Sequence, residues 1–212
     1  MKKIILGLTL AMGLVSCGDS FLDVTPKDKL SDATFWQSEK DVDMALNGCY
    51  KGWEAITNIV FLDAASDNGY EQFNYNFQEI GNGQILPTSS PGLYATWVDG
   101  NATTWFRYDR IRKYNNFLEK IENVEMDESK KEQYKAEVRF LRAYDYFNKV
   151  MFYGDIPLID KVITSAEEAN LSRTPKAEVE DFILKELEAV AAILPVQNML
   201  ESSGHITKGA AL

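Results

Sequence analysis

The chain has 212 residues, 45% of them hydrophobic and 12% aromatic, which is enough to bury the core of one domain, or of one domain and part of another. Its formal net charge is −10, and no basic cluster stands out. This balance argues against a nucleic-acid partner and against electrostatic adhesion to anionic lipid.

Residues 1–16 are predicted to be a lipoprotein signal peptide. Two lysines precede an apolar run that ends at Leu14-Val15-Ser16-Cys17, which looks like a bacterial lipobox. The run is shorter than the roughly 20 residues that a membrane-spanning helix needs. We therefore expect cleavage before Cys17 and lipid attachment to it, which would anchor the protein to a membrane outside the cytoplasm. A soluble secreted protein with an incidental cysteine is the alternative.

Residues 17–34 show no helical period and are predicted to be a lipidated tether to a globular part, residues 35–212. With Cys17 lipidated, Cys49 is the only other cysteine, so no disulfide within the chain is expected. We expect Cys49 to be a small buried residue; a catalytic thiol is the alternative.

Amphipathic helices are predicted wherever apolar residues recur at spacings of three and four. Four such stripes, in chain order, are Val42, Leu46, Cys49, Trp53 and Ile56; Trp105, Tyr108, Ile111, Asn115, Leu118 and Ile121; Tyr134, Val138, Leu141, Tyr144, Asn148 and Met151; and Val179, Ile183, Leu187, Val190 and Leu194. Ser38 should cap the first helix, and Thr174 the last, with proline at its first position. Gly154 and Pro157 should end the third helix, and Pro195 the last.

Helices in pairs predict a mainly α fold, an α-solenoid scaffold of tetratricopeptide-like helix pairs. The final segment, residues 204–212, has the pattern of a helix that has just begun, so we expect the chain to be a fragment.

Residues 63–100 are predicted to be a long loop insertion with an unusual aromatic content. Flat rings beside polar groups suit stacking against a sugar face. The candidate ligand-binding residues are therefore Trp97, Tyr94, Tyr70, Phe73, Asp67 and Asn68. The alternative is that the rings pack the loop onto the helices, as we expect for Trp53, Trp105, Tyr108 and Tyr144 on their helical stripes.

No catalytic constellation, cofactor or metal site is predicted. The single histidine, His205, leaves little room for a catalytic triad or a histidine-rich metal site, and we expect it to be exposed in the first turn of a helix. No pair of carboxylates stands out as a glycosidase pair, so a surface glycoside hydrolase is a minor alternative.

Several segments together resemble the SusD/RagB family of nutrient-binding surface lipoproteins. They are Phe21-Leu22-Asp23, Ala45-Leu46-Asn47-Gly48-Cys49-Tyr50, Ser66-Asp67, residues 136–147 with 153–158, and residues 204–212, where His205 stands in place of a frequent arginine. In residues 136–147, Arg139 and Arg142 share a helix face, whereas Glu137 does not. We expect helix-packing ion pairs from this cluster; ligand or transporter contact is the alternative.

The resemblance implies a non-catalytic protein at the surface of the outer membrane. It would bind glycan or another nutrient and deliver it to a SusC-like TonB-dependent transporter. A structural or gating lid of that transporter, with little ligand affinity of its own, is the alternative. The resemblance also implies that the C-terminal part of the family fold is absent from these 212 residues.

Overall fold

The computed structural model describes residues 35–51, 63, 66–69, 83, 107–197 and 204–212. The described helices are α2 (Glu39–Tyr50), α5 (Asp109–Lys120), the 3-10 helix η2 (Ile121–Asn123), α6 (Glu128–Tyr153), α7 (Lys176–Ala191) and α8 (Lys208–Ala211). In the described part, the only extended pairing is an isolated antiparallel bridge between Ile156 and Thr174. The mainly α prediction is therefore confirmed.

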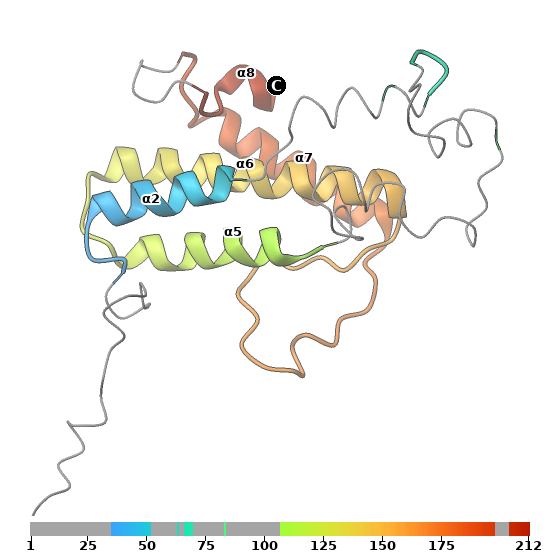
Figure 1. Cartoon of the computed structure of the whole chain (residues 1–212), viewed down its shortest axis with the longest axis horizontal. Coiled ribbons are helices and arrows are strands. Elements are labelled where there is room, and N and C mark those ends of the chain that lie inside the picture. Colours follow the sequence, from blue (N-terminus) through green and yellow to red (C-terminus); the bar gives the residue numbers. More distant parts are fainter. Residues whose placement is uncertain (1–34, 52–62, 64–65, 70–82, 84–106, 198–203) are drawn as a thin grey trace, which may run out of the picture.

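The long helix α6 lies at the centre, with α2 and α5 running beside it and α7 packed across it (Figure 1). Because it has neighbours on several sides, α6 buries residues around much of its circumference, including Ala136, Val138, Leu141 and Tyr146. Successive helices α5, α6 and α7 pack as neighbours, which gives the expected tetratricopeptide-like helix pairs.

Helix α2 begins where Ser38 and Asp41 share hydrogen bonds. The Asp41 carboxylate accepts from the Ser38 backbone N–H at 2.9 Å and from the Ser38 hydroxyl at 2.8 Å. These bonds lower the pKa of Asp41 and fix the first turn. The predicted stripe Val42, Leu46 and Cys49 is buried, whereas Trp53 and Ile56 lie outside the described residues.

Helix α6 begins at an N-cap that was not predicted and ends at the predicted Gly154. The Asp127 side chain accepts from the Lys130 backbone N–H at 2.9 Å, and the helix ends at Gly154, whose φ of +67° a residue with a side chain adopts only under strain. The predicted stripe is buried at Val138 and Leu141, but Met151 is 63% exposed. The prediction is therefore wrong for Met151, because the buried stripe ends one turn earlier.

The start of α7 differs from the prediction. Pro175, not Thr174, is the N-cap residue, and the Asp155 side chain accepts from the Lys176 backbone N–H at 2.8 Å. Thr174 is occupied elsewhere: its backbone pairs with Ile156, and its hydroxyl accepts from the Leu158 N–H at 3.3 Å. The two ends of the connection from α6 to α7 are thereby tied together.

The two predicted core aromatics that the structure describes are only half-buried. Tyr108 and Tyr144 pack at the edge of the core, and Trp105 and Trp53 lie outside the described residues. Among the described residues, the fully buried rings are Tyr114, Phe117 and Tyr146.

Candidate functional site

Most of the predicted ligand contacts, namely Tyr70, Phe73, Tyr94 and Trp97, lie outside the described residues, as does the predicted lipid attachment site, Cys17. They remain predictions, as does the aromatic loop insertion itself.

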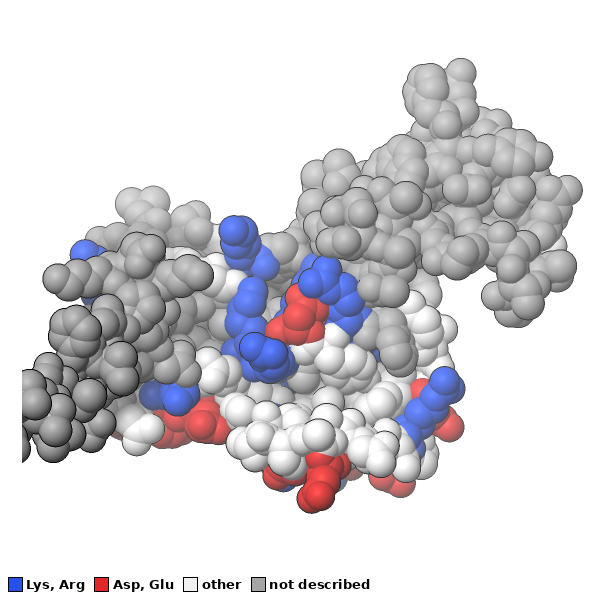
Figure 2. All heavy atoms as spheres, turned by 60° about the horizontal axis from the view of Figure 1, so that its bottom comes forward, with Lys and Arg blue, Asp and Glu red and all other residues white. Residues whose placement is uncertain are grey.

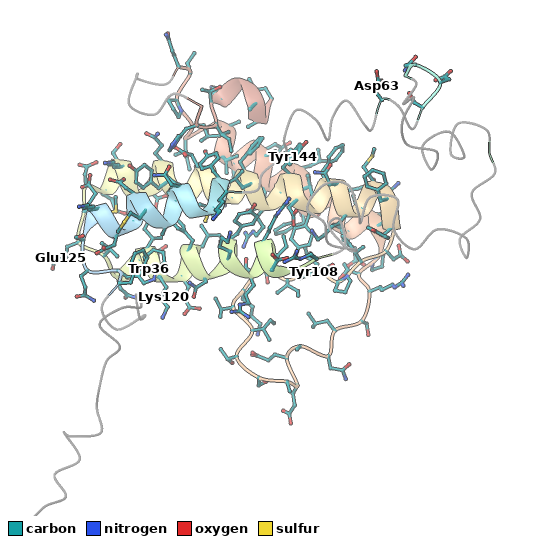
Figure 3. The ribbon with its side chains drawn as sticks, viewed as in Figure 1. Trp36, Asp63, Tyr108, Lys120, Glu125 and Tyr144 are labelled. Carbon is teal, nitrogen blue, oxygen red and sulfur yellow. The ribbon has the colours of Figure 1, made fainter. Side chains whose placement is uncertain are left out.

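Asp67 and Asn68 are described, and both are exposed in a tight turn. The Ser66 hydroxyl donates to the Asp63 carbonyl at 2.7 Å and accepts from the Asn68 backbone N–H at 3.1 Å. Figure 3 places Asp63 well away from the helices. The turn is thus held by its own hydrogen bonds, and the exposed Asp67 and Asn68 side chains are available to a ligand.

The cationic pair on α6 serves helix packing, as predicted. Arg139 donates to the two Glu186 carboxylate oxygens at 3.1 and 2.7 Å, and Arg142 donates to one of them at 2.9 Å. Burial disfavours the charged carboxylate, but the two guanidinium groups outweigh this effect and lower the pKa of Glu186. One carboxylate of α7 is therefore clamped by two arginines of α6.

Glu137 belongs to a different network, which also holds the only histidine. Its fully buried carboxylate accepts from the Tyr50 hydroxyl at 2.7 Å, and its other oxygen accepts from Gln133 at 3.1 Å. His205 Nδ1 lies 2.8 Å from the same oxygen that Tyr50 contacts, and the Ile206 N–H donates to the Tyr50 hydroxyl at 3.1 Å.

The expectation of an exposed histidine in a helix's first turn is therefore wrong. His205 is half-buried before α8 starts, because the buried Glu137 carboxylate provides it with a hydrogen-bond partner. The network joins α2, α6 and the segment leading into α8.

A strap, residues 157–161, lies against α5 and α6 and is held by their polar side chains. Asn115 donates to the carbonyls of Ile159 and Lys161 at 3.0 and 2.8 Å, and the Tyr108 hydroxyl donates to the Pro157 carbonyl at 2.7 Å. The Tyr146 hydroxyl both donates to the Ile159 carbonyl and accepts from the Ile159 N–H.

Arg142 links the strap to the helices. It donates to the Asn115 side-chain oxygen at 2.7 Å and to the Asp160 carbonyl at 3.0 Å. Arg142 and Tyr146 of α6 thus hold the backbone of the strap in place.

Two further buried groups are structural. The Cys49 thiol is 2% exposed, and burial raises its pKa to about 12, so it stays a neutral thiol and not the nucleophilic thiolate. Lys149 is 1% exposed and bonds Asp145 one turn earlier; burial lowers the pKa of the amine and raises that of the carboxyl. Within the described ranges, no group of three potential metal-binding side chains comes together.

A hollow with mixed aromatic and polar walls lies at the start of α2 and the end of α5. It has a volume of about 470 Å³ and is lined by Phe35, Trp36, Gln37, Lys120, Asn123 and Glu125. Figure 3 shows Trp36, Lys120 and Glu125 at the same end of the helical layer.

Trp36 is held in this hollow by contacts with two other rings. Its ring packs edge-on against the buried Phe117 ring, with centroids 5.7 Å apart, and against Phe35 at 5.2 Å. Its backbone has φ +70°, an uncommon conformation for a bulky residue, which the packing has to stabilise. We call this feature the Trp36 hollow. Sequence reasoning missed it, although two adjacent rings ahead of a helix cap were a visible signal.

Packed helix pairs bound together by buried polar networks, with no catalytic cluster in the described ranges, define a helical scaffold protein. The chain belongs to the SusD-like family: residues 20–212 match the family model described as "Starch-binding associating with outer membrane".

Similar proteins agree with this assignment. "SusD-like protein P38" of Formosa agariphila is 26% identical over 195 residues, which are 89% of this chain and 37% of that protein. A SusD-like protein from Bacteroides fragilis has a crystal structure with a TM-score of 0.72 and 30% identity, covering 89% of this chain and 36% of that one. The crystal structure of a SusD-like carbohydrate-binding protein from the same species has a TM-score of 0.68 and 29% identity, covering 84% of this chain and 36% of that one.

The chain therefore spans less than two fifths of the length of these relatives. Among the described residues, no helix is both long enough and apolar enough to cross a membrane.

Proposed function

We propose that this protein binds glycan at the cell surface, without cleaving it, and delivers it to a SusC-like TonB-dependent transporter in the outer membrane. The observation that carries the proposal is the family match over residues 20–212, together with a structural relative described as carbohydrate-binding. The helical scaffold would present loops and hollows to the ligand, and the ring and amides of the Trp36 hollow have the chemistry that sugar recognition needs.

The proposed organisation follows the sequence. Residues 1–16 are a signal peptide, Cys17 is the acylated residue, residues 17–34 form the tether, and residues 35–212 are the N-terminal helical domain of the SusD-like fold. Cys17→Ala should release the protein from the membrane fraction and abolish its labelling with a palmitate analogue. A variant that stays fully membrane-bound would contradict lipid anchoring at Cys17.

The binding role is tested with the full-length gene product, purified in detergent and screened against a panel of polysaccharides and host glycans. We expect saturable binding and no release of shorter sugars after prolonged incubation. Reproducible product formation would overturn the non-catalytic assignment, and a folded protein that binds no glycan would overturn the binding role.

Trp97→Ala tests the predicted loop contact, with Val196→Ala as a control because Val196 is an exposed apolar residue on a different segment. We expect weaker glycan binding only for Trp97→Ala. The transporter proposal is tested separately by gentle extraction and affinity capture, and it fails if no TonB-dependent transporter is recovered.

A further inference from the structure

A basic face lies along α5 in this otherwise acidic protein. Residues 107–120 contain five basic and two acidic side chains, whereas the whole chain has a net charge of −10. The expectation that no basic cluster exists is therefore wrong for this segment. Figure 2, which turns the α5 side forward, shows Lys and Arg side chains gathered in the middle of the view, with acidic side chains among them and others along the lower edge.

The side chains of this face differ in how far they are neutralised. Arg110 turns inward to Asp145 at 3.9 Å, and Arg107 pairs with Asp109 at 3.0 Å. Arg112 and Lys51 are exposed and have no ion pair within the described part of the chain. Cations without a counter-charge among the described side chains therefore remain on this face.

Lys51 and α5 are brought together by the packing of α2. Lys113, also exposed, donates from Nζ to the Gly48 carbonyl at 3.0 Å, which holds the last turn of α2, directly before Lys51, against α5. We define the α5 basic face as Lys51, Arg107, Arg112, Lys113 and Lys120.

The helix dipole does not explain why Arg112 and Lys113 are basic. Arg112 and Lys113 lie in the N-terminal half of α5, and the helix dipole favours cations at the opposite end. Like charges placed side by side on an exposed face repel each other, and an anionic ligand would remove that repulsion.

The basic face leads into the Trp36 hollow. Lys113 and Lys120 are seven residues apart and so share one side of α5, and Lys120 lines the hollow. The 12 residues of α5 extend over about 18 Å at 1.5 Å per residue. The side of α5 that has Lys113 and Lys120 thus leads to the aromatic ring of Trp36 at its end.

We propose that this surface binds an anionic glycan, a chain of sugars bearing carboxylate or sulfate groups, laid along α5 with one ring against Trp36. The inference rests on the proposed function and names its ligand class. Arg112 can take a carboxylate or sulfate with two parallel hydrogen bonds, and the lysines act as point charges. Trp36 and the amides of Gln37 and Asn123 would contact the ring and its hydroxyls.

The test compares charged and uncharged glycans that share a backbone. Binding of the full-length protein is measured by calorimetry with polygalacturonate against its methyl ester, and with dextran sulfate against dextran. We expect binding of a charged member of at least one pair, weakened by added salt, and no comparable binding of its uncharged counterpart.

Lys51→Gln/Arg112→Gln should weaken that binding about two- to thirtyfold, because each exposed pair contributes ~0.2–1 kcal/mol. Lys176→Gln/Lys185→Gln removes two exposed cations from α7 and should leave the affinity unchanged. Arg112→Lys should retain most of the affinity, since it keeps the charge.

The outcomes separate this inference from the proposed function. If an uncharged glycan binds as tightly as its charged counterpart, or if Lys51→Gln/Arg112→Gln binds like the wild type, the anionic-ligand inference is wrong and glycan binding still stands. If that variant loses transporter capture but keeps its glycan affinity, the face is a protein contact and the inference is wrong. Folded protein that binds no glycan of either charge overturns both.

Discussion

Replacing Glu186 with glutamine is expected to lower the free energy of unfolding by ~3 kcal/mol at pH 7. The substitution leaves the guanidinium groups of Arg139 and Arg142 without their counter-charge, and the Arg142 side chain is only 7% exposed. We take the lower end of the range for a broken buried pair, because the Arg139 side chain is 29% exposed and water can partly replace the lost contact.

The stability lost in Glu186→Gln should depend on pH, and the direction of this dependence follows from the lowered pKa of Glu186. A carboxylate with a lower pKa in the folded state stabilises the protein above its ordinary pKa of about 4.5. That contribution disappears as the pH falls through the folded-state pKa. The difference in the free energy of unfolding between wild type and Glu186→Gln should therefore be largest at pH 7 and decrease progressively below pH ~4.5.

The measurement is urea unfolding at several pH values, followed by far-ultraviolet circular dichroism. Glu188→Gln is the matched control, since Glu188 is exposed on the same helix. A loss of less than ~1 kcal/mol for Glu186→Gln, as for a surface pair, would refute the argument that the clamp is effectively buried. A gap that stays constant from pH 7 to pH 3 would refute the assignment of its origin to the carboxylate charge.

Three further predictions follow from the packing. Leu141→Ala should lower the free energy of unfolding by ~2–5 kcal/mol in urea, whereas Met151→Ala on the same helix should lower it by less than ~0.5 kcal/mol. Equal losses would contradict the burial of Leu141 and the exposure of Met151. Asn115→Ala should speed proteolysis of the strap by removing two bonds to its carbonyls, with the half-buried Asn116→Ala as the comparison. Cys49 should react with a thiol reagent at pH 8 only after unfolding, and rapid labelling of native protein would show that its burial is incomplete.

Helix positions could be predicted from the sequence because the signals are local. Ser38 and Gly154 act on backbone within a few residues, and the spacing of Val138 and Leu141 needs only one turn to be visible. The choice of core rings could not be predicted in this way. Tyr146 points to a different side of α6 from Tyr144, and it is buried only because α6 has neighbours on several sides.

The polar networks were also beyond sequence reasoning, except for the arginine pair. Arg139 and Arg142 could be assigned to one helix face, which correctly predicted a packing role. The partner of His205 is Glu137, 68 residues earlier, and no local pattern reveals that pairing. The Trp36 hollow was missed for the same reason, since Trp36 and Lys120 meet only through tertiary packing.

The Tyr50 network has a consequence for the order in which the chain assembles. Tyr50 bonds Glu137, 87 residues later, and Ile206, 156 residues later, whereas α5, α6 and α7 pack against sequence neighbours. Local contacts form fastest, so the α5–α6–α7 unit should form first and α2 should dock afterwards. Until those partners are in place, the apolar stripe of α2 stays exposed. The first described helix should therefore be among the last to find all its partners, and its exposed apolar stripe should favour aggregation until then.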